Sequence, residues 1–423
     1  MFLGATAFDQ DLSQWDISSA TTMESMLRFT SMSEENYDAT LIGWATLEPG
    51  ETQIPSNVVL EVDATYCLGV NAKNTLINAP YDWSIDDGGL GCPDEDLFIT
   101  TWNIATDFEF ITLPIVGSGL DFVVDWGDGR VTFETQEAYH TYENAGIYTM
   151  RILGNFNRLN FDGYPSNKNI ITIEQWGPNS WTSMEDAFNG CANLKLNADD
   201  VPDLSSVGST QRMFQGCTNL EDLQDKMNDW DMSAVSNTSA MFENCSIFNE
   251  VIGDWTVDNV RTMNAMFQSA TAFNQDLSSW NTSKVTSFDN LFFGASSFNQ
   301  SLGSWDISTA NAMGNMLVDA GMSSDNYDTT LIGWATLETG ETQIPTDITL
   351  DANITYCLGE DARNTLTSTT YNWMINDSGK NCTDAFIITW QVEAGEEIMI
   401  PVFNVFIDHN YNCLLYTSDA ADD

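Results

Sequence analysis

Carboxylates are the side chains with the most scope for chemistry in this sequence. There are 62 Asp and Glu residues, but only two histidines, His140 and His409. Two histidines leave little material for a histidine-based zinc site or for a triad of nucleophile, histidine and acid. Acid pairs that could cleave glycosides recur in no context that predicts a pocket. We therefore expect a protein that is not an enzyme.

Calcium is the one cofactor that the acidic residues could bind, because this ion prefers oxygen ligands. The candidate ligands are Asp125, Asp128 and the acidic loop 82–91. No EF-hand pattern or glycine-rich Asp nonapeptide accompanies them in the sequence. Asp128 also stands between Gly127 and Gly129, where a tight hairpin needs a turn-forming residue. The expectation is no cofactor, with a calcium site as the alternative.

The charge of the chain excludes several classes of partner. Its 423 residues carry 13 Lys and Arg, which gives a formal net charge of −49. Nucleic acids and acidic membranes would repel such a chain, since binding to them needs clustered basic residues. The hydrophobic content of 43% is nevertheless enough for a folded core. No apolar run reaches the roughly 20 residues that span a bilayer.

A repeat of about 25 residues places aromatic side chains in columns. Within a unit such as residues 266–280, apolar positions first have helical and then extended spacing. A short helical turn followed by a strand is therefore predicted, and stacked copies would form a solenoid with a continuous core. The columns contain Trp230, Trp255, Trp280 and Trp305, and Phe242, Phe267 and Phe292.

A second, larger repeat shows that a whole block has been duplicated with a shift of 290 residues. The segment DATLIGWATLEPGETQIPS at 38–56 returns as DTTLIGWATLETGETQIPT at 328–346. Both copies follow repeat units and lead into a TYC sequence. Because the end of an array must cover its last apolar layer, we interpret both segments as caps.

Three units carry a resemblance to a known family: MFLGATAFDQDLSQWDIS, MFQSATAFNQDLSSWNTS and LFFGASSFNQSLGSWDIS. They resemble BspA-like leucine-rich repeat surface proteins of bacteria, over residues 1–46 and about 167–335. The resemblance implies a leucine-rich-repeat-like solenoid and a role in adhesion. The chain opens inside a repeat, so we expect the signal peptide and anchor to be missing from this fragment.

The segment between the arrays resembles another family. LDFVVDWGDGRVTF, followed by HTYENAGIYTMRI, is similar to PKD (polycystic kidney disease) domains. This resemblance implies an immunoglobulin-like β-sandwich of the extracellular kind. Because the segment is short, edge strands could come from the adjoining array. The last residues, CLLYTSDAADD, resemble a translated sequencing adapter.

These patterns predict a succession of modules along the chain. In order, they are the end of a first array (1–46), its cap (47–95), a PKD-like sandwich (96–155), a second array (156–335), a second cap (336–384), the start of a truncated PKD-like module (385–404) and a non-native tail (405–423).

Cysteine spacing indicates an oxidising compartment. Cys67 and Cys92 are 25 residues apart, and Cys357 and Cys382 repeat that spacing in the second cap. We predict two disulfides, and hence a secreted or cell-surface location. A second group of cysteines occupies a column that holds alanine in other units, so we expect these side chains to be buried in the core. The sequence does not decide whether they form disulfides with one another. The group contains Cys191, Cys217 and Cys245.

Alternation along the predicted strands gives a candidate ligand face. If Leu12, Ile252, Leu277 and Leu302 point inward, small polar residues point to solvent. This face would suit an extracellular protein or polysaccharide, so a binding or adhesion protein is favoured. The alternatives are a passive stalk of a larger surface protein and a β-helix polysaccharide-degrading enzyme. The predicted face contains Asp11, Ser13, Asp276, Ser278, Ser301 and Gly303.

Overall fold

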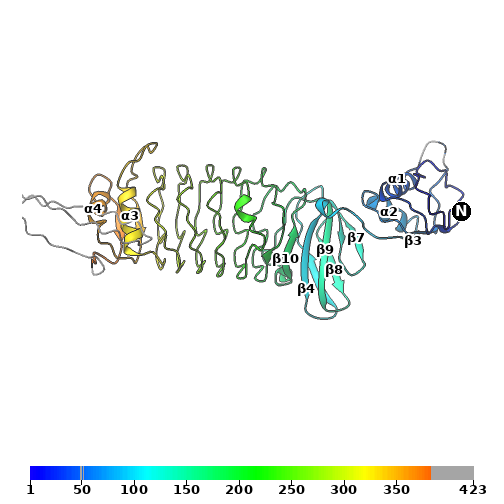
Figure 1. The fold of residues 1–423 in the computed structure, drawn as a ribbon, viewed down its shortest axis with the longest axis horizontal. Helices are drawn as coiled ribbons and strands as arrows, with labels where there is room; N and C mark the ends of the chain where they lie inside the picture. Colours follow the sequence, from blue (N-terminus) through cyan, green and yellow to red (C-terminus); the bar gives the residue numbers. More distant parts are fainter. Residues whose placement is uncertain (48–49, 51, 383–423) are drawn as a thin grey trace, which may run out of the picture. The chain divides into compact units, whose positions relative to one another are not determined.

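The structure is a computed structural model that describes residues 1–47, 50 and 52–382. Residues 1–382 form one compact unit. The predicted truncated module at 385–404 and the predicted non-native tail at 405–423 lie outside the described residues. Figure 1 shows the order of the helices and strands along the chain.

The first 92 residues form two helices and a small parallel sheet. Helix α1 begins after Ser33, whose side chain caps it by accepting a hydrogen bond from the Asn36 amide. The strands are joined in the order β1-β2-β3, all parallel. The elements are β1 (Met23–Leu27), α1 (Glu34–Trp44), β2 (Val59–Val62), α2 (Val70–Ile77) and β3 (Ser84–Asp86).

Four of these five elements recur after the second set of repeats; in place of β1, Met313 forms only an isolated bridge to Leu350. Ser323 caps α3 by accepting a hydrogen bond from the Asn326 amide, as Ser33 does for α1. Strands β12 and β13 are parallel neighbours. The duplicated sequence therefore folds in the same way twice. The elements are α3 (Ser324–Trp334), β12 (Thr349–Asp351), α4 (Glu360–Leu366) and β13 (Met374–Asn376).

Residues 94–196 contain most of the strands. One sheet has the order β11-β10-β4-β9-β6-β7, and β5 pairs with β8 in a separate sheet. Buried residues of both sheets share one core. The elements are η1 (Asp94–Asp96), β4 (Phe98–Ile104), β5 (Glu109–Leu113), β6 (Asp121–Asp125), β7 (Val131–Glu134), β8 (Ala138–Tyr142), β9 (Gly146–Asn155), η2 (Pro165–Lys168), β10 (Ile170–Gln175) and β11 (Lys195–Leu196).

The larger sheet extends beyond the module predicted at 96–155. β10 pairs antiparallel with β4, and β11 pairs parallel with β10. The hairpin between β6 and β7 turns at Gly127 and Gly129, which have φ angles of +77° and +89°. Gly127 is also required for space, because a Cβ there would lie 2.5 Å from the Thr149 carbonyl oxygen.

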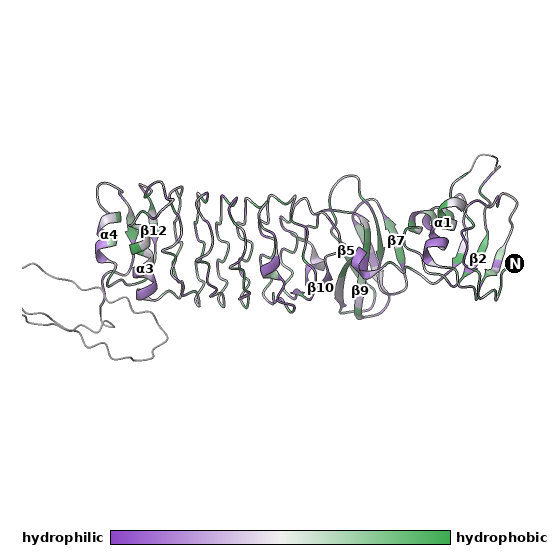
Figure 2. Ribbon diagram, turned by 45° about the horizontal axis from the view of Figure 1, so that its top comes forward, coloured by the Kyte–Doolittle hydropathy of each residue, from purple (hydrophilic) through white to green (hydrophobic). Residues whose placement is uncertain are grey.

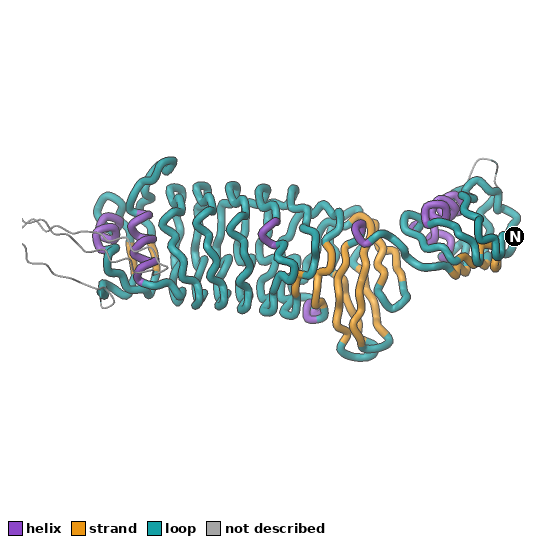
Figure 3. Tube along the Cα trace, viewed as in Figure 1, coloured by secondary structure: helices purple, strands orange, loops and turns teal. Residues whose placement is uncertain are grey.

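The predicted leucine-rich-repeat-like solenoid of helical turns and strands is wrong. Residues 176–322, all described, contain no α-helix; their only helix and strand are η3 (Met227–Asp229) and the two-residue β11. Figure 3 shows this repeat segment almost wholly as loop and turn. The secondary structure of the chain consists instead of small mixed sheets and short helices. The combined prediction of a solenoid with a β-sandwich is corrected accordingly.

The side-chain composition of the repeat segment explains why helical turns and strands were wrongly predicted. Ser, Thr, Asn and Asp side chains bond to backbone groups two residues away and so favour turns over helix and strand. Neighbouring units pair at isolated bridges, such as Asn237 with Thr262, and through backbone hydrogen bonds, such as that from the Phe242 amide to the Met266 carbonyl, without forming regular strands. Hydrophobic and hydrophilic residues alternate along these loops in Figure 2. The apolar spacing indicated burial correctly but not the backbone conformation.

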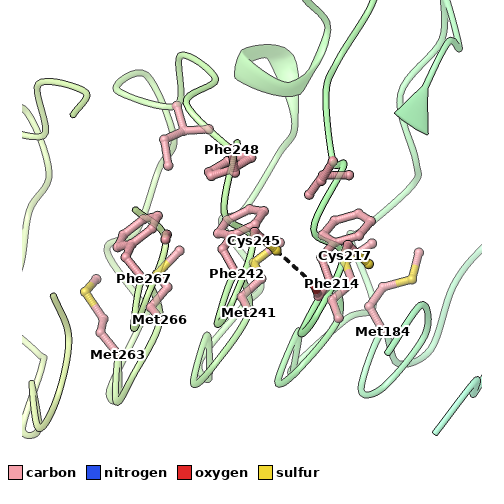
Figure 4. Packing of buried hydrophobic residues seen from close by; sticks show 14 of the residues in the cluster. Met184, Phe214, Cys217, Met241, Phe242, Cys245, Phe248, Met263, Met266 and Phe267 are labelled. Carbon is pink, nitrogen blue, oxygen red and sulfur yellow. Dashed lines mark hydrogen bonds between the residues drawn. The ribbon is translucent and has the colours of Figure 1, made fainter. Parts of the chain in front are cut away.

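Aromatic columns hold the units of the repeat segment together. The rings of Phe242 and Phe267 stack with centroids 5.8 Å apart, and those of Phe267 and Phe292 with centroids 5.6 Å apart. Figure 4 shows Phe214, Phe242 and Phe267 in a row. Each ring is fully buried. These columns are therefore core, and they leave the polar residues between them to form the surface.

Candidate binding surface

The predicted ligand face is a row of turns rather than a face of strands. Asp276 Oδ1 accepts a 2.9 Å hydrogen bond from the Ser278 amide, and Asp11 Oδ1 accepts one of 2.7 Å from the Ser13 amide. Ser301 Oγ accepts a longer bond of 3.3 Å from the Gly303 amide. The alternation of exposure holds, because the leucines between these pairs are buried: Leu12, Leu277 and Leu302.

The same two-residue turn recurs at the next corner of several units. Hydrogen bonds from Ser205 lower the pKa of Asp203, and those from Ser233 lower the pKa of Asp231. The cause is that these amides and hydroxyls donate to the charged carboxylate. The carboxylates of these turns therefore accept hydrogen bonds that hold the local backbone conformation. Further pairs of this kind are Asp16 with Ser18, Asn281 with Ser283 and Asp306 with Ser308.

The structure brings part of the predicted face into a shallow groove beside α3, with a volume of about 820 Å³. Ser278, Ser301 and Gly303 line it, whereas Asp11 and Ser13 belong to the first block. The other lining residues come from neighbouring units, from α3 and from the loop after it: Asn281, Ser283, Ser304, Asp306, Thr329, Ile332, Gly333, Glu338, Thr339, Gly340 and Glu341.

Two glycines bring α3 against the last repeat unit. A Cβ on Gly333 would lie 2.1 Å from the Gly303 carbonyl oxygen, and a Cβ on Gly303 would lie 2.6 Å from the Thr329 carbonyl oxygen. The first block has the same close approach, since a Cβ on Gly43 would lie 2.5 Å from Ser13. The groove therefore begins where helix backbone meets turn backbone without intervening side chains.

The loop after α3 is tied to the repeat unit by Ser308. Ser308 Oγ accepts a 3.2 Å hydrogen bond from the Thr342 amide, and its carbonyl accepts one of 3.1 Å from Gln343 Nε2. Ser18 makes the same two bonds with Thr52 and Gln53 in the first block. The lining of the groove includes three acids and no Lys or Arg, so its charge is negative: Asp306, Glu338 and Glu341.

The two candidate calcium ligands are engaged in the β6–β7 turn. Asp125 Oδ1 accepts from the Gly127 amide at 2.9 Å, and Asp128 Oδ1 accepts from the Arg130 amide at 3.1 Å. The other Asp128 oxygen lies 2.8 Å from His140 Nε2. In the acidic loop 82–91, Asp87 pairs with Lys73. Within the described residues, no cluster of three or more His, Cys, Asp or Glu side chains could hold a metal ion.

Both predicted cysteine pairs are bonded: Cys67 to Cys92 and Cys357 to Cys382. The cysteines of the repeat column are free thiols in the core, and burial raises the pKa of each. The thiol of Cys245 donates to the Phe214 carbonyl at 2.9 Å, as drawn in Figure 4. These thiols are therefore packing groups in this structure.

Turn-rich repeat units and two disulfide-bonded segments with duplicated sequence define a modular repeat protein. The family described as "Mycoplasma protein of unknown function, DUF285" matches residues 1–47, 158–226 and 209–330. These ranges cover more than half of the chain, and the chain belongs to this family. The comparisons with curated proteins and with solved structures found no match. Among the described residues, no helix is long and apolar enough to cross a membrane.

Most of the residues that line the groove were not predicted from the sequence. The repeat pattern predicted Ser278, Ser301 and Gly303, but not the helix residue Ile332 or the loop acids Glu338 and Glu341. These residues lie in the duplicated cap, outside the 25-residue pattern. The near-identity of the two GETQIP loops was the available signal, since it marks a segment with a fixed position relative to the repeat.

Proposed function

We propose that the chain is a secreted or cell-surface bacterial protein that binds an extracellular protein or polysaccharide without catalysis. The resemblance of its units to BspA-like surface proteins supports this proposal, as does the PKD-like segment between the arrays. The two disulfides support an oxidising location. The observation that carries the binding role is the acidic groove beside α3, which extends across two repeat units.

The groove suits a ligand that makes many weak polar contacts. Its hydroxyls, carboxylates and backbone groups are spread along an open surface rather than gathered in an enclosed pocket. The aliphatic side chain of Ile332, 38% exposed, adds one apolar contact. An open site of this kind favours an extended chain over a small metabolite, because small ligands need concave sites that bury most of their surface.

A passive stalk is the second candidate, and the turns favour it. The carboxylates of Asp11 and Asp276 already accept hydrogen bonds from their own turns. A surface whose carboxylates already accept hydrogen bonds from the protein's own backbone can keep a repeat protein soluble without any ligand. A binding protein should lose affinity for its ligand when residues of the groove are substituted, whereas a passive stalk has no ligand to lose.

The test uses the immobilised chain with a panel of polysaccharides and extracellular matrix proteins, in calcium and again with chelator. Ser278→Arg and Ser304→Arg place a large side chain in the groove and should weaken binding at least about tenfold. Ser296→Arg is the matched control, because Ser296 is an exposed serine of the same repeat segment outside the groove. If no ligand of the panel binds the unmodified chain, the stalk is supported.

A further inference from the structure

The outer face of the β5–β8 sheet carries an exposed pair of aromatic rings. In this antiparallel pair, Ile111 lies opposite His140 and Thr112 opposite Tyr139. Ile111 and His140 are buried, so their neighbours Phe110 and Tyr139 lie on the opposite face. The Phe110 and Tyr139 rings stack there with centroids 5.8 Å apart and an angle of 18° between the planes.

Exposure separates this pair from the other stacked aromatics. Phe110 is 59% and Tyr139 is 47% exposed, whereas the stacked Phe242 and Phe267 of the repeat segment are fully buried. These two exposed rings form an apolar surface, which we call the platform. Burying such rings against a ligand is favourable, and exposed clusters of this kind mark interaction sites.

A carboxylate at the edge of the platform supplies polar contacts. The Tyr139 hydroxyl donates to Glu137 Oε2. The Tyr164 hydroxyl lies against the same carboxylate, which raises the pKa of Tyr164 to about 12. Glu137 Oε1 is buried, so this carboxylate positions the phenols rather than meeting a ligand. An exposed apolar surface thus adjoins two phenol hydroxyls, which can accept from hydroxyl donors.

We propose that Phe110, Tyr139 and Tyr164 form a binding site for a neutral polysaccharide, with Glu137 positioning the two phenols. The C–H face of a sugar ring packs on the exposed aromatic pair, while its hydroxyls bond to the phenols. Charge selects against acidic glycans, because Glu137 and the net charge of −49 repel uronate and sulfate groups. This inference rests on the proposed binding function, but the site lies on a different module from the groove.

The experiment measures binding of the full chain to three neutral probes, laminarin, mannan and xylan, and to two anionic ones, alginate and chondroitin sulfate. At least one neutral probe should bind, and neither anionic probe should. Phe110→Ala and Tyr139→Ala should each weaken that binding about tenfold. Phe110→Leu keeps an apolar side chain but removes the ring, and should weaken binding to a similar extent.

Phe29→Ala serves as the control, since Phe29 is 65% exposed and belongs to the first block. It should bind like the unmodified chain. Circular dichroism and melting temperature establish that each variant is folded. Binding retained by Phe110→Leu but lost by Phe110→Ala would overturn sugar stacking in favour of general apolar docking, as would a dimer that Phe110→Ala dissociates.

The outcomes for the platform and for the groove are separable. Neutral-glycan binding that survives every platform substitution but is lost in Ser278→Arg would overturn the platform site and support the groove. Binding to no neutral probe would also overturn the platform, while binding to a matrix protein would still support the proposed function.

Discussion

The indole of Trp280 donates a 3.1 Å hydrogen bond to the carbonyl oxygen of Ile252, a residue of the preceding repeat unit. Trp255 makes the same bond to Met227, and Trp305 makes it to Leu277. Each tryptophan thus packs in the core and donates to a carbonyl that also accepts from a backbone amide of its own unit, which for Ile252 is the Trp255 amide. The indole bond therefore adds a side-chain link between neighbouring units.

Removing one such indole donor should destabilise the chain without opening a large cavity. Trp280→Phe removes the indole donor of the buried Ile252 carbonyl, which keeps its bond from the Trp255 amide, so we expect a cost of about 0.5–1.5 kcal/mol in the free energy of unfolding. Urea unfolding followed by circular dichroism measures this loss. Trp15→Phe is the matched control, because Trp15 is 39% exposed in the first unit. Equal losses in the two variants would contradict the role of the indole bond.

The disulfides should stabilise the caps locally. Each closes a loop with a sequence separation of 25 residues, and chain-entropy models give about 3 kcal/mol for a loop of this length. Replacing both Cys67 and Cys92 with serine should accelerate hydrogen exchange in residues 58–92 more than in the repeat segment. The equivalent double variant of Cys357 and Cys382 should affect the second cap alone. Uniform acceleration along the chain would show that the caps do not unfold independently.

Sequence patterns predicted the positions of the core side chains well. The columns through Trp255 and Phe267 are buried and stacked as expected, because apolar periodicity reports burial directly. The pairing of Cys67 with Cys92 followed from a spacing that recurs in the duplicated cap. In these cases the evidence was local in sequence or repeated along the chain.

Backbone conformation and the groove were harder to predict. Asp276 and Ser278 alternate with Leu277 as in a strand, yet their mutual hydrogen bond makes a turn. Alternation of burial is common to both conformations, so spacing alone could not distinguish them. The groove depends on the close approach of Gly333 to Gly303, a tertiary contact between a helix and a turn. The 25-residue pattern contains no information about that contact.

The buried thiols should be unreactive in the folded chain. Cys191, Cys217 and Cys245 are each fully buried, and burial raises the pKa of each thiol, so little nucleophilic thiolate forms near neutral pH. Iodoacetamide followed by peptide mapping should label none of them under native conditions and all three in 6 M guanidinium chloride. Labelling of any of the three before unfolding would contradict their place in the core.

The turns of the repeat segment should lose part of their stability in acid. The folded pKa of Asp231 is lowered by hydrogen bonds from the Ser233 hydroxyl and amide. The resulting stabilisation is therefore present above the unfolded pKa of about 3.9 and is lost as the pH falls through the lower folded value. Asp231→Asn cannot change its charge, so it should be less stable than the unmodified chain at pH 6. Solvent screening keeps the difference under about 1 kcal/mol.

Comparing the unmodified chain with Asp231→Asn isolates this effect, because titration of the other acids is common to both proteins. The difference between their free energies of unfolding in urea should shrink towards zero between pH 6 and about pH 3. Ser233→Ala removes only one of the two donors to Asp231, so its difference from the unmodified chain should show a smaller pH dependence. A difference for Asp231→Asn that is constant with pH would mean that the turn does not depend on the carboxylate charge.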